Sequence, residues 1–165
     1  MSSIQTSPRA SERPEAGTSE MRLEVVVVPV HDVDESLHFY QIMGFRLDVD
    51  YVGGPDFRVV QLTPPGSRCS IIIGSGITTA APGSLDGLIL VVYDLEASRD
   101  ELIARGVDVS EPFVDEGGVF HHIGTQGRVP GLDPDRRAYR SQASFSDPDG
   151  NRWFLQEVKT PAPGR

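Results

Sequence analysis

Cysteine, basic charge and long apolar runs are all scarce in this sequence, and each scarcity argues against a class of protein. The single cysteine, Cys69, cannot form an internal disulfide, which favours a reducing compartment such as the cytoplasm. No apolar run approaches the roughly 20 residues that span a bilayer. Residues 1–20 also contain no apolar core of the kind that a secretion signal needs. We therefore expect a cytoplasmic protein with no membrane partner.

The charge balance is acidic, with 15 lysine and arginine residues against 24 aspartate and glutamate residues and a formal net charge of −9. An acidic surface repels phosphate backbones, so we expect no nucleic-acid partner. The 165 residues are 38% hydrophobic and 24% charged. This length and composition suit one compact domain or two small fused modules.

Both ends of the chain are poor in apolar residues. Residues 1–20 are rich in serine, proline and glutamate and cannot bury enough surface to offset the entropy lost on ordering. We predict a disordered tail over residues 1–20 and a loose C-terminus over residues 160–165. The folded domain is then expected to span residues 21–159.

The clearest local signal is the segment 144–158, SFSDPDGNRWFLQEV, in which two strand-like runs flank a turn. Pro148 presets φ for a turn and Gly150 tolerates a positive φ, so the segment is predicted to be a hairpin. A weaker copy occurs at residues 62–73, where an offset of 84 residues aligns Gly66 with Gly150. This echo indicates that the protein is built twice.

A strand followed by a helix also occurs twice, at an offset of 62 residues that aligns Asp32 with Asp94 and Gly44 with Gly106. Asp32 and Glu35 have the spacing of a capping box, and Gly44 is a plausible helix stop. Matching Asp and Gly residues at helix ends are common in general, so chance similarity is the alternative. Each copy is predicted to run strand, helix, strand, strand, strand, which is an α+β pattern.

The two offsets divide the folded domain into module one at residues 21–76, a linker at residues 77–85 and module two at residues 86–159. Because the offset grows from 62 to 84 along the module, the second copy carries 22 extra residues. We place them in an inserted loop at about residues 113–141. A loop of that length in a compact domain is usually functional or disordered.

The paired modules, a V-x-D strand exit in each and the terminal DPDGNRWFLQEV together resemble the vicinal oxygen chelate superfamily. That superfamily includes glyoxalase I, extradiol dioxygenases, fosfomycin resistance enzymes and bleomycin resistance proteins. The resemblance covers about residues 21–159. It implies two tandem βαβββ modules whose curved sheets surround a cup-shaped cavity. It does not imply one activity, because one fold serves many chemistries.

Metal-dependent members of that superfamily carry His, Glu or Gln at four strand positions that face the cup. The resemblance carries these positions onto Val25, Ser70, Gly87 and Phe154 of this sequence. Valine, glycine and phenylalanine side chains offer no lone pair, and neutral serine is a poor ligand. We therefore predict no metal in that site and no cofactor.

The cup is instead predicted to be an apolar pocket with a few polar contacts, suited to a small organic or aromatic molecule. Strand alternation and the resemblance together give a set of eight wall residues, which are Val25, Val27, Ser70, Gly87, Ile89, Val91, Phe154 and Gln156. The alternative is that these residues fill a closed hydrophobic core.

The inserted loop holds the groups most suited to proton transfer. Histidine side chains titrate near neutral pH, and His121 and His122 are adjacent there. In an extended segment only one of the two is expected to face the cup. Tyr139 is a candidate proton donor, and Arg137 is a candidate partner for an anionic oxygen. The alternative for all four is a solvated surface loop.

Two functions fit these features. The first is a metal-independent lyase or isomerase that transforms a small organic molecule by acid–base chemistry, through isomerisation, cyclisation or elimination. The alternative is a binding protein of the bleomycin-resistance type that sequesters a toxic small molecule, for which an acidic body favours a cationic drug. The resemblance implies a homodimer with cups between subunits for such proteins. A metal-dependent glyoxalase-like lyase or dioxygenase is a third alternative.

Overall fold

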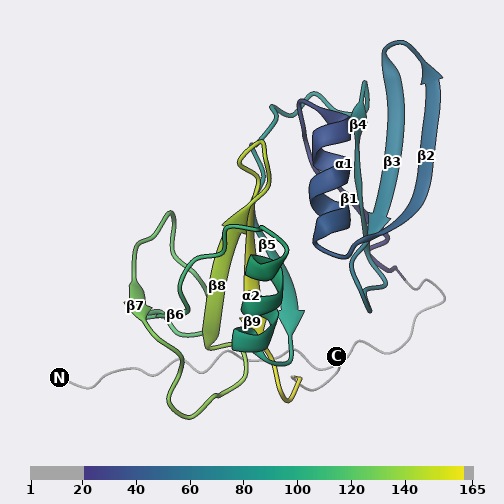
Figure 1. Ribbon diagram of the computed structural model, residues 1–165. Coiled ribbons are helices and arrows are strands. Elements are labelled where there is room, and N and C mark those ends of the chain that lie inside the picture. The colour runs from purple at the N-terminus through teal and green to yellow at the C-terminus, as the bar shows by residue number, and fades with distance from the viewer. Residues whose placement is uncertain (1–20, 162–165) are drawn as a thin grey trace.

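The computed structural model describes residues 21–161, so the predictions for residues 1–20 and for the last four residues lie outside the described part. Two modules of similar topology follow one another along the chain (Figure 1). The prediction of an α+β fold made of two tandem βαβββ modules is confirmed, and the second module carries one additional strand. Neither helix in the described residues is long and apolar enough to cross a membrane.

Module one consists of β1 (Val25–Val27), α1 (Val33–Ile42), β2 (Arg46–Gly54), β3 (Phe57–Thr63) and β4 (Ser70–Ser75). Its sheet has the order β1-β4-β3-β2, with β1 parallel to β4 and the other pairs antiparallel. The helix begins where the capping residues predict, because the Asp32 carboxylate accepts a hydrogen bond from the Glu35 N–H at 3.0 Å. It ends just before Gly44, whose φ of 91° favours glycine.

Module two consists of β5 (Asp86–Val92), α2 (Leu95–Ala104), β6 (Phe113–Asp115), β7 (Arg128–Pro130), β8 (Ser141–Ser146) and β9 (Arg152–Glu157). Its sheet has the order β5-β9-β8-β6-β7. Strand β6 takes the place that β2 has in module one. Residues 55–56 join β2 to β3, whereas residues 116–140 join β6 to β8. We call residues 116–140 the insertion; β7 lies within it.

One hydrophobic core packs the helices of both modules against their sheets. Its largest buried side chains include Tyr40, Phe45, Leu62, Ile73, Phe145, Trp153 and Leu155. Aromatic rings from the two modules meet in it, with the Trp153 ring centroid 5.9 Å from that of Tyr40 and 6.1 Å from that of Phe45. The two modules are therefore packed together through the side of each sheet that faces its helix.

The turn between β8 and β9, residues 147–151, closes the predicted hairpin and also ties the modules together. The Tyr40 hydroxyl donates to Asp147 Oδ2 at 2.8 Å, and Asn151 Nδ2 donates to the Pro29 carbonyl at 2.8 Å. Gly150 has a φ of 94°, as the turn requires. The segment that the sequence singles out is thus a joint between the two halves of the chain.

Each sheet leaves one face without a covering helix. In module one this open face carries Val25, Val27, Val49, Tyr51, Gln61, Ser70 and Ile72, which the strand register places on the same side. In module two the open face carries Ile89, Val91, Phe113, Gln142, Ser144, Phe154 and Gln156. The two sheets are separate and are not closed into one barrel in the part of the chain that the structure describes (Figure 1).

Candidate functional site

Phe154 lies at the centre of the open face of module two. On β9 it is flanked by Ile89 of β5 and Ser144 of β8, its register partners. The His121 ring stacks on the Phe154 ring with a centroid separation of 4.0 Å and an angle of 22° between the planes. Phe154 is fully buried as a result, while His121 keeps partial exposure. The insertion therefore supplies the outer surface of this wall.

Side chains of β9 hold the insertion in place. Gln156 Nε2 donates to the carbonyl oxygens of Val119 and Tyr139, each at 2.9 Å. Arg152 Nη1 donates to the Gly124 carbonyl at 2.7 Å. These three bonds anchor the insertion at separate points along its length, so it lies over the open face of module two as a cover.

Gly87 lies directly beside the histidine of the stack. A β-carbon built on Gly87 would come within 3.2 Å of His121 Nε2, and the φ of this glycine is 100°. The His121 imidazole therefore lies next to the position that a side chain at residue 87 would occupy. A larger residue at this position would push His121 away from Phe154.

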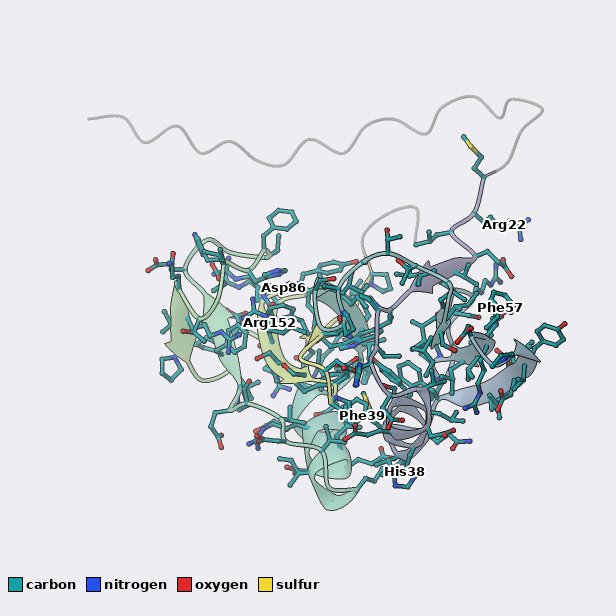
Figure 2. The ribbon with its side chains drawn as sticks, turned by 90° about the horizontal axis from the view of Figure 1, so that it is seen from above. Arg22, His38, Phe39, Phe57, Asp86 and Arg152 are labelled. Atoms are coloured by element: carbon teal, nitrogen blue, oxygen red, sulfur yellow. The ribbon has the colours of Figure 1, made fainter. Side chains whose placement is uncertain are left out.

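Two guanidinium groups surround the buried phenylalanine. The Arg128 guanidinium carbon lies 4.1 Å from the Phe113 ring centroid and 5.9 Å from that of Phe154, and that of Arg152 lies 5.2 Å from Phe154. Arg152 also pairs with Asp86 at 2.7 Å, and Figure 2 shows these two side chains together at one edge of module two. Cation–π contacts of this kind place positive charge around an aromatic floor.

His122 points away from the stack and pairs with Asp115. Its Nδ1 lies 2.7 Å from Asp115 Oδ1, and its backbone N–H donates to Oδ2 at 3.0 Å. Burial acts to raise the pKa of the Asp115 carboxyl, but the N–H groups of Gly117 and His122 and the His122 ring together hold that pKa below its ordinary value. The carboxylate therefore fixes the orientation of the imidazole. Sequence reasoning missed Asp115.

Arg137 and Tyr139 have other partners. Arg137 pairs with the buried Asp133 carboxylate at 2.6 Å, and its hydrogen bonds lower the pKa of Asp133 to about 2. The Tyr139 N–H donates to the Glu157 carbonyl at 2.8 Å, and its own carbonyl accepts from Gln156. These bonds fix the base of the insertion. The roles of Arg137 as an anion holder and of Tyr139 as a proton donor stay predictions.

The remaining wall residues of the prediction lie on the open face of module one. Val25 pairs by register with Ser70, and Val27 with Ile72. Ser70 Oγ lies 2.7 Å from Thr63 Oγ1, whose hydroxyl donates to Asp48. The eight predicted wall residues are thus divided between two separate faces, with Val25, Val27 and Ser70 on one and Gly87, Ile89, Val91, Phe154 and Gln156 on the other.

The four positions at which the superfamily resemblance would place metal ligands do not fit a divalent metal. Val25 and Ser70 lie side by side on one sheet, and Gly87 and Phe154 lie on the other. The ring of His121 next to Gly87 brings one imidazole, which is too few donors for a protein metal site. Within residues 21–161 no three His, Cys, Asp or Glu side chains gather as a metal-binding group.

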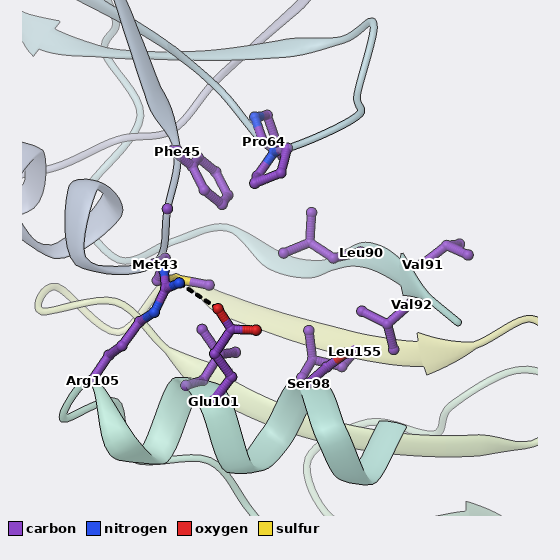
Figure 3. Close-up of a pocket in the computed structure, with 13 residues that line it drawn as sticks. Met43, Phe45, Pro64, Leu90, Val91, Val92, Ser98, Glu101, Arg105 and Leu155 are labelled. Carbon is purple, nitrogen blue, oxygen red and sulfur yellow. Dashed lines mark hydrogen bonds and ion pairs between the residues drawn. The ribbon is translucent and has the colours of Figure 1, made fainter. Parts of the chain in front are cut away.

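A pocket of about 370 Å³ opens elsewhere, between the two modules (Figure 3). Its walls include Met43, Phe45, Pro64, Leu90, Val91, Leu102, Arg105 and Leu155. Arg105 pairs with Glu101 at its rim and donates to the Ile42 carbonyl at 3.2 Å. Most of these side chains continue the apolar core, and of the predicted site residues the pocket includes Val91.

Comparison with known proteins agrees with the topology. The family model of the Glyoxalase/Bleomycin resistance protein/Dioxygenase superfamily matches residues 22–155. A search of the curated proteins finds no match to the chain.

Solved structures give closer detail. The chain is 31% identical to TnmS3, an antibiotic binding protein from Streptomyces sp. CB03234, with 86% of this chain and 99% of that chain covered and a TM-score of 0.63. It is 32% identical to a glyoxalase/bleomycin resistance protein from the same organism, with 82% and 100% covered and a TM-score of 0.59. A superfamily member from Sphaerobacter thermophilus DSM 20745 is 25% identical, with 84% and 98% covered and a TM-score of 0.61.

Proposed function

Because the chain belongs to the Glyoxalase/Bleomycin resistance protein/Dioxygenase superfamily, we propose that it binds a small organic molecule through an aromatic ring and does not transform it. The observation that carries this proposal is the stack of His121 on Phe154, in which the partly exposed imidazole forms the outer ring. A planar ring can extend such a stack at van der Waals distance. The antibiotic-binding relative at 31% identity supports binding as the function.

The surroundings of the stack are apolar enough to bind such a molecule. Phe120 and Ile123 of the insertion and Ile89 and Val91 of β5 are exposed, although all four are large and apolar. A monomeric protein rarely exposes such groups together unless they bind something. The absence of metal-ligating side chains at Val25, Ser70, Gly87 and Phe154 supports a site that works without a metal ion.

We further propose that the site is completed in a homodimer. The open face of module one exposes Tyr51 to 57%, and the open face of module two exposes Val91 to 55%. Each face still exposes large apolar side chains, and the insertion covers only part of the module-two face. In a two-fold dimer, the module-one face of one copy lies over the module-two face of the other, which buries both and forms two equivalent sites. The ligand then lies between His121 and the valines of the second copy.

Replacing His121 by alanine tests the ligand site. We expect His121→Ala to weaken binding of the neutral probe anthracene-2-carboxamide about tenfold, because the outer ring of the stack is lost. Fluorescence titration of the probe measures the dissociation constant. The control is His38→Ala, which removes an exposed histidine from α1 and should leave the constant unchanged. Equal affinity in wild type and His121→Ala would show that the stack is not the site.

A charge on the open face of module one tests the dimer. We expect Tyr51→Glu to weaken self-association at least a hundredfold, because a carboxylate would be buried without a partner. Light scattering distinguishes the 18.0 kDa monomer from the dimer. Ile103→Glu adds the same charge at an exposed position of α2 and should leave the dimer intact. A wild-type protein that stays monomeric at high micromolar concentration would remove the dimer from the proposal.

One observation favours a second candidate function, a metal-independent enzyme that uses acid–base chemistry. The Asp115 carboxylate orients the His122 ring, which is the arrangement of a histidine that moves protons. The two candidates differ in the fate of the ligand. If a bound molecule is recovered unchanged by mass spectrometry after prolonged incubation, the binding function stands and the enzyme is rejected for that ligand.

A further inference from the structure

One cation at the candidate site, Arg128, is only partly balanced by nearby negative charge among the described residues. The Arg128 guanidinium carbon lies over the Phe113 ring, 4.1 Å from its centroid, and 5.9 Å from the centroid of Phe154. Among the described residues its guanidinium has no hydrogen bond and no ion pair. Its charged neighbours are engaged elsewhere, since Arg152 pairs with Asp86, and Asp115 bonds His122 and the Gly117 N–H.

The surroundings of Arg128 disfavour a positive charge. Burial, and then the nearby Arg152, lower the pKa of Arg128, and the Asp115 carboxylate only partly opposes them. An arginine that stays charged under these conditions gains from any anion that enters beside it.

A second donor without a partner lies on the same face. Gln142 on β8 is paired by register with Phe113 and with Gln156, so it lies beside the residue whose ring the Arg128 guanidinium covers. It is 1% exposed, and its Nε2 has no hydrogen-bond partner in the part of the chain that the structure describes. Buried amide N–H groups are nearly always bonded, so this donor indicates an acceptor that residues 21–161 do not supply.

We propose that the aromatic molecule of the proposed function carries a carboxylate, which Arg128 binds and which Gln142 helps to position. The inference rests on that proposed function and narrows it to a ligand class. It opposes the expectation from the net charge of −9, which favours a cationic drug. The charges within a few ångströms act most strongly on a bound molecule, and among them the Arg128 guanidinium is the one that makes no ion pair with a described residue, whereas the acidic residues of the surface act mainly on approach.

Three probes that share one ring system test the charge preference. They are anthracene-2-carboxylate, its neutral carboxamide and 2-(aminomethyl)anthracene, titrated at pH 7 by fluorescence. We expect the carboxylate to bind about tenfold more tightly than the carboxamide and the ammonium probe to bind most weakly. In Arg128→Met, which retains an unbranched apolar stem, the carboxylate should lose this advantage while the carboxamide binds as before.

Two controls isolate the role of the guanidinium. Arg68→Met removes one exposed arginine from a turn of module one and should preserve the preference. The second control is the comparison of the carboxylate with the carboxamide in the wild type. It needs no variant, so it decides the charge preference even if Arg128→Met does not fold.

The possible outcomes distinguish a failure of the anion preference from a failure of the proposed binding function. If the carboxamide binds the wild type as tightly as the carboxylate does, or the ammonium probe binds best, the anion preference is overturned and the binding function stands. If none of the three probes binds the wild type, the proposed function fails and the inference fails with it.

Discussion

Arg136→Met is expected to lower the free energy of unfolding by about 3 kcal/mol. The Glu157 carboxylate is fully buried and accepts from Arg136 Nε at 2.8 Å, from Arg136 Nη2 at 2.5 Å and from the Leu95 N–H at 2.9 Å. Removing one partner of a buried ion pair leaves the other charge without compensation, which costs about 3–5 kcal/mol. We expect the lower end because the Arg136 side chain is 28% exposed. Urea unfolding at pH 7 measures the loss.

A matched change separates the buried pair from its surface neighbour. Glu96 also pairs with Arg136, at 3.3 Å, but its side chain is 59% exposed. Glu96→Gln should therefore change the free energy of unfolding by less than about 0.5 kcal/mol. Similar losses in Glu96→Gln and Arg136→Met would mean that the buried carboxylate is not what the arginine stabilises.

Acid should reduce the difference between Arg136→Met and the wild type. In the wild type the hydrogen bonds from Arg136 hold the pKa of Glu157 below its ordinary value of 4.5, against the effect of burial. The stabilisation is complete above pH 4.5 and is lost as the pH falls through the lower folded pKa. In the variant the guanidinium is lost and burial acts to raise the pKa of Glu157, opposed mainly by the Leu95 N–H, so protonation costs the folded state less than in the wild type. Unfolding curves at pH 7 and below pH 4.5 compare the two.

Tyr40→Phe is expected to lower the free energy of unfolding by about 2 kcal/mol, although it removes a single oxygen. The Tyr40 hydroxyl is buried, donates to Asp147 at 2.8 Å and accepts from Trp153 Nε1 at 3.1 Å. Burial, and then the Asp147 charge, raise the pKa of this hydroxyl, so it is the protonated donor at any ordinary pH. Without it the indole N–H has no acceptor, and a buried unsatisfied group costs about 1–3 kcal/mol.

The test for this network is a double-mutant cycle. Trp153→Phe added to Tyr40→Phe should cost less than the sum of the single changes, because the orphaned N–H is removed as well. Tyr93→Phe serves as the control, since Tyr93 is largely exposed and its change should cost under about 0.5 kcal/mol. Strict additivity in thermal or urea unfolding would contradict a shared hydrogen-bond network.

Local chemistry explains why so much of the fold follows from the sequence. Asp32 and Asp94 begin the two helices, and each carboxylate accepts an N–H from three residues onward. The β8–β9 hairpin follows from its proline and glycine turn. These signals act over a few residues and leave a readable pattern. The second function of that turn, bonding Tyr40 and Pro29 of module one, depends on partners more than 100 residues away and left no such pattern.

The candidate site was less predictable because it depends on where a long loop returns to the sheet. The sequence favoured His121 and His122 for their chemistry, and the structure places them on different partners, Phe154 and Asp115. The sequence also favoured Arg137 as a partner for an anionic oxygen. In the structure its guanidinium forms an ion pair with Asp133 instead. The sequence shows that these charged and titratable residues are close along the chain, but it does not show which of them form pairs in the fold. Arg128, in the middle of the insertion on β7, was not singled out for this reason.

The insertion makes the two halves of this duplicated chain unequal. The open face of module two presents imidazole and guanidinium groups, whereas that of module one presents mainly valine and isoleucine side chains with a few neutral polar groups. In the proposed dimer, a ligand with one polar end and one apolar end then binds in a single orientation. A direct repeat of module one would have offered it two equivalent poses. Loss of internal symmetry is in this sense the source of selectivity.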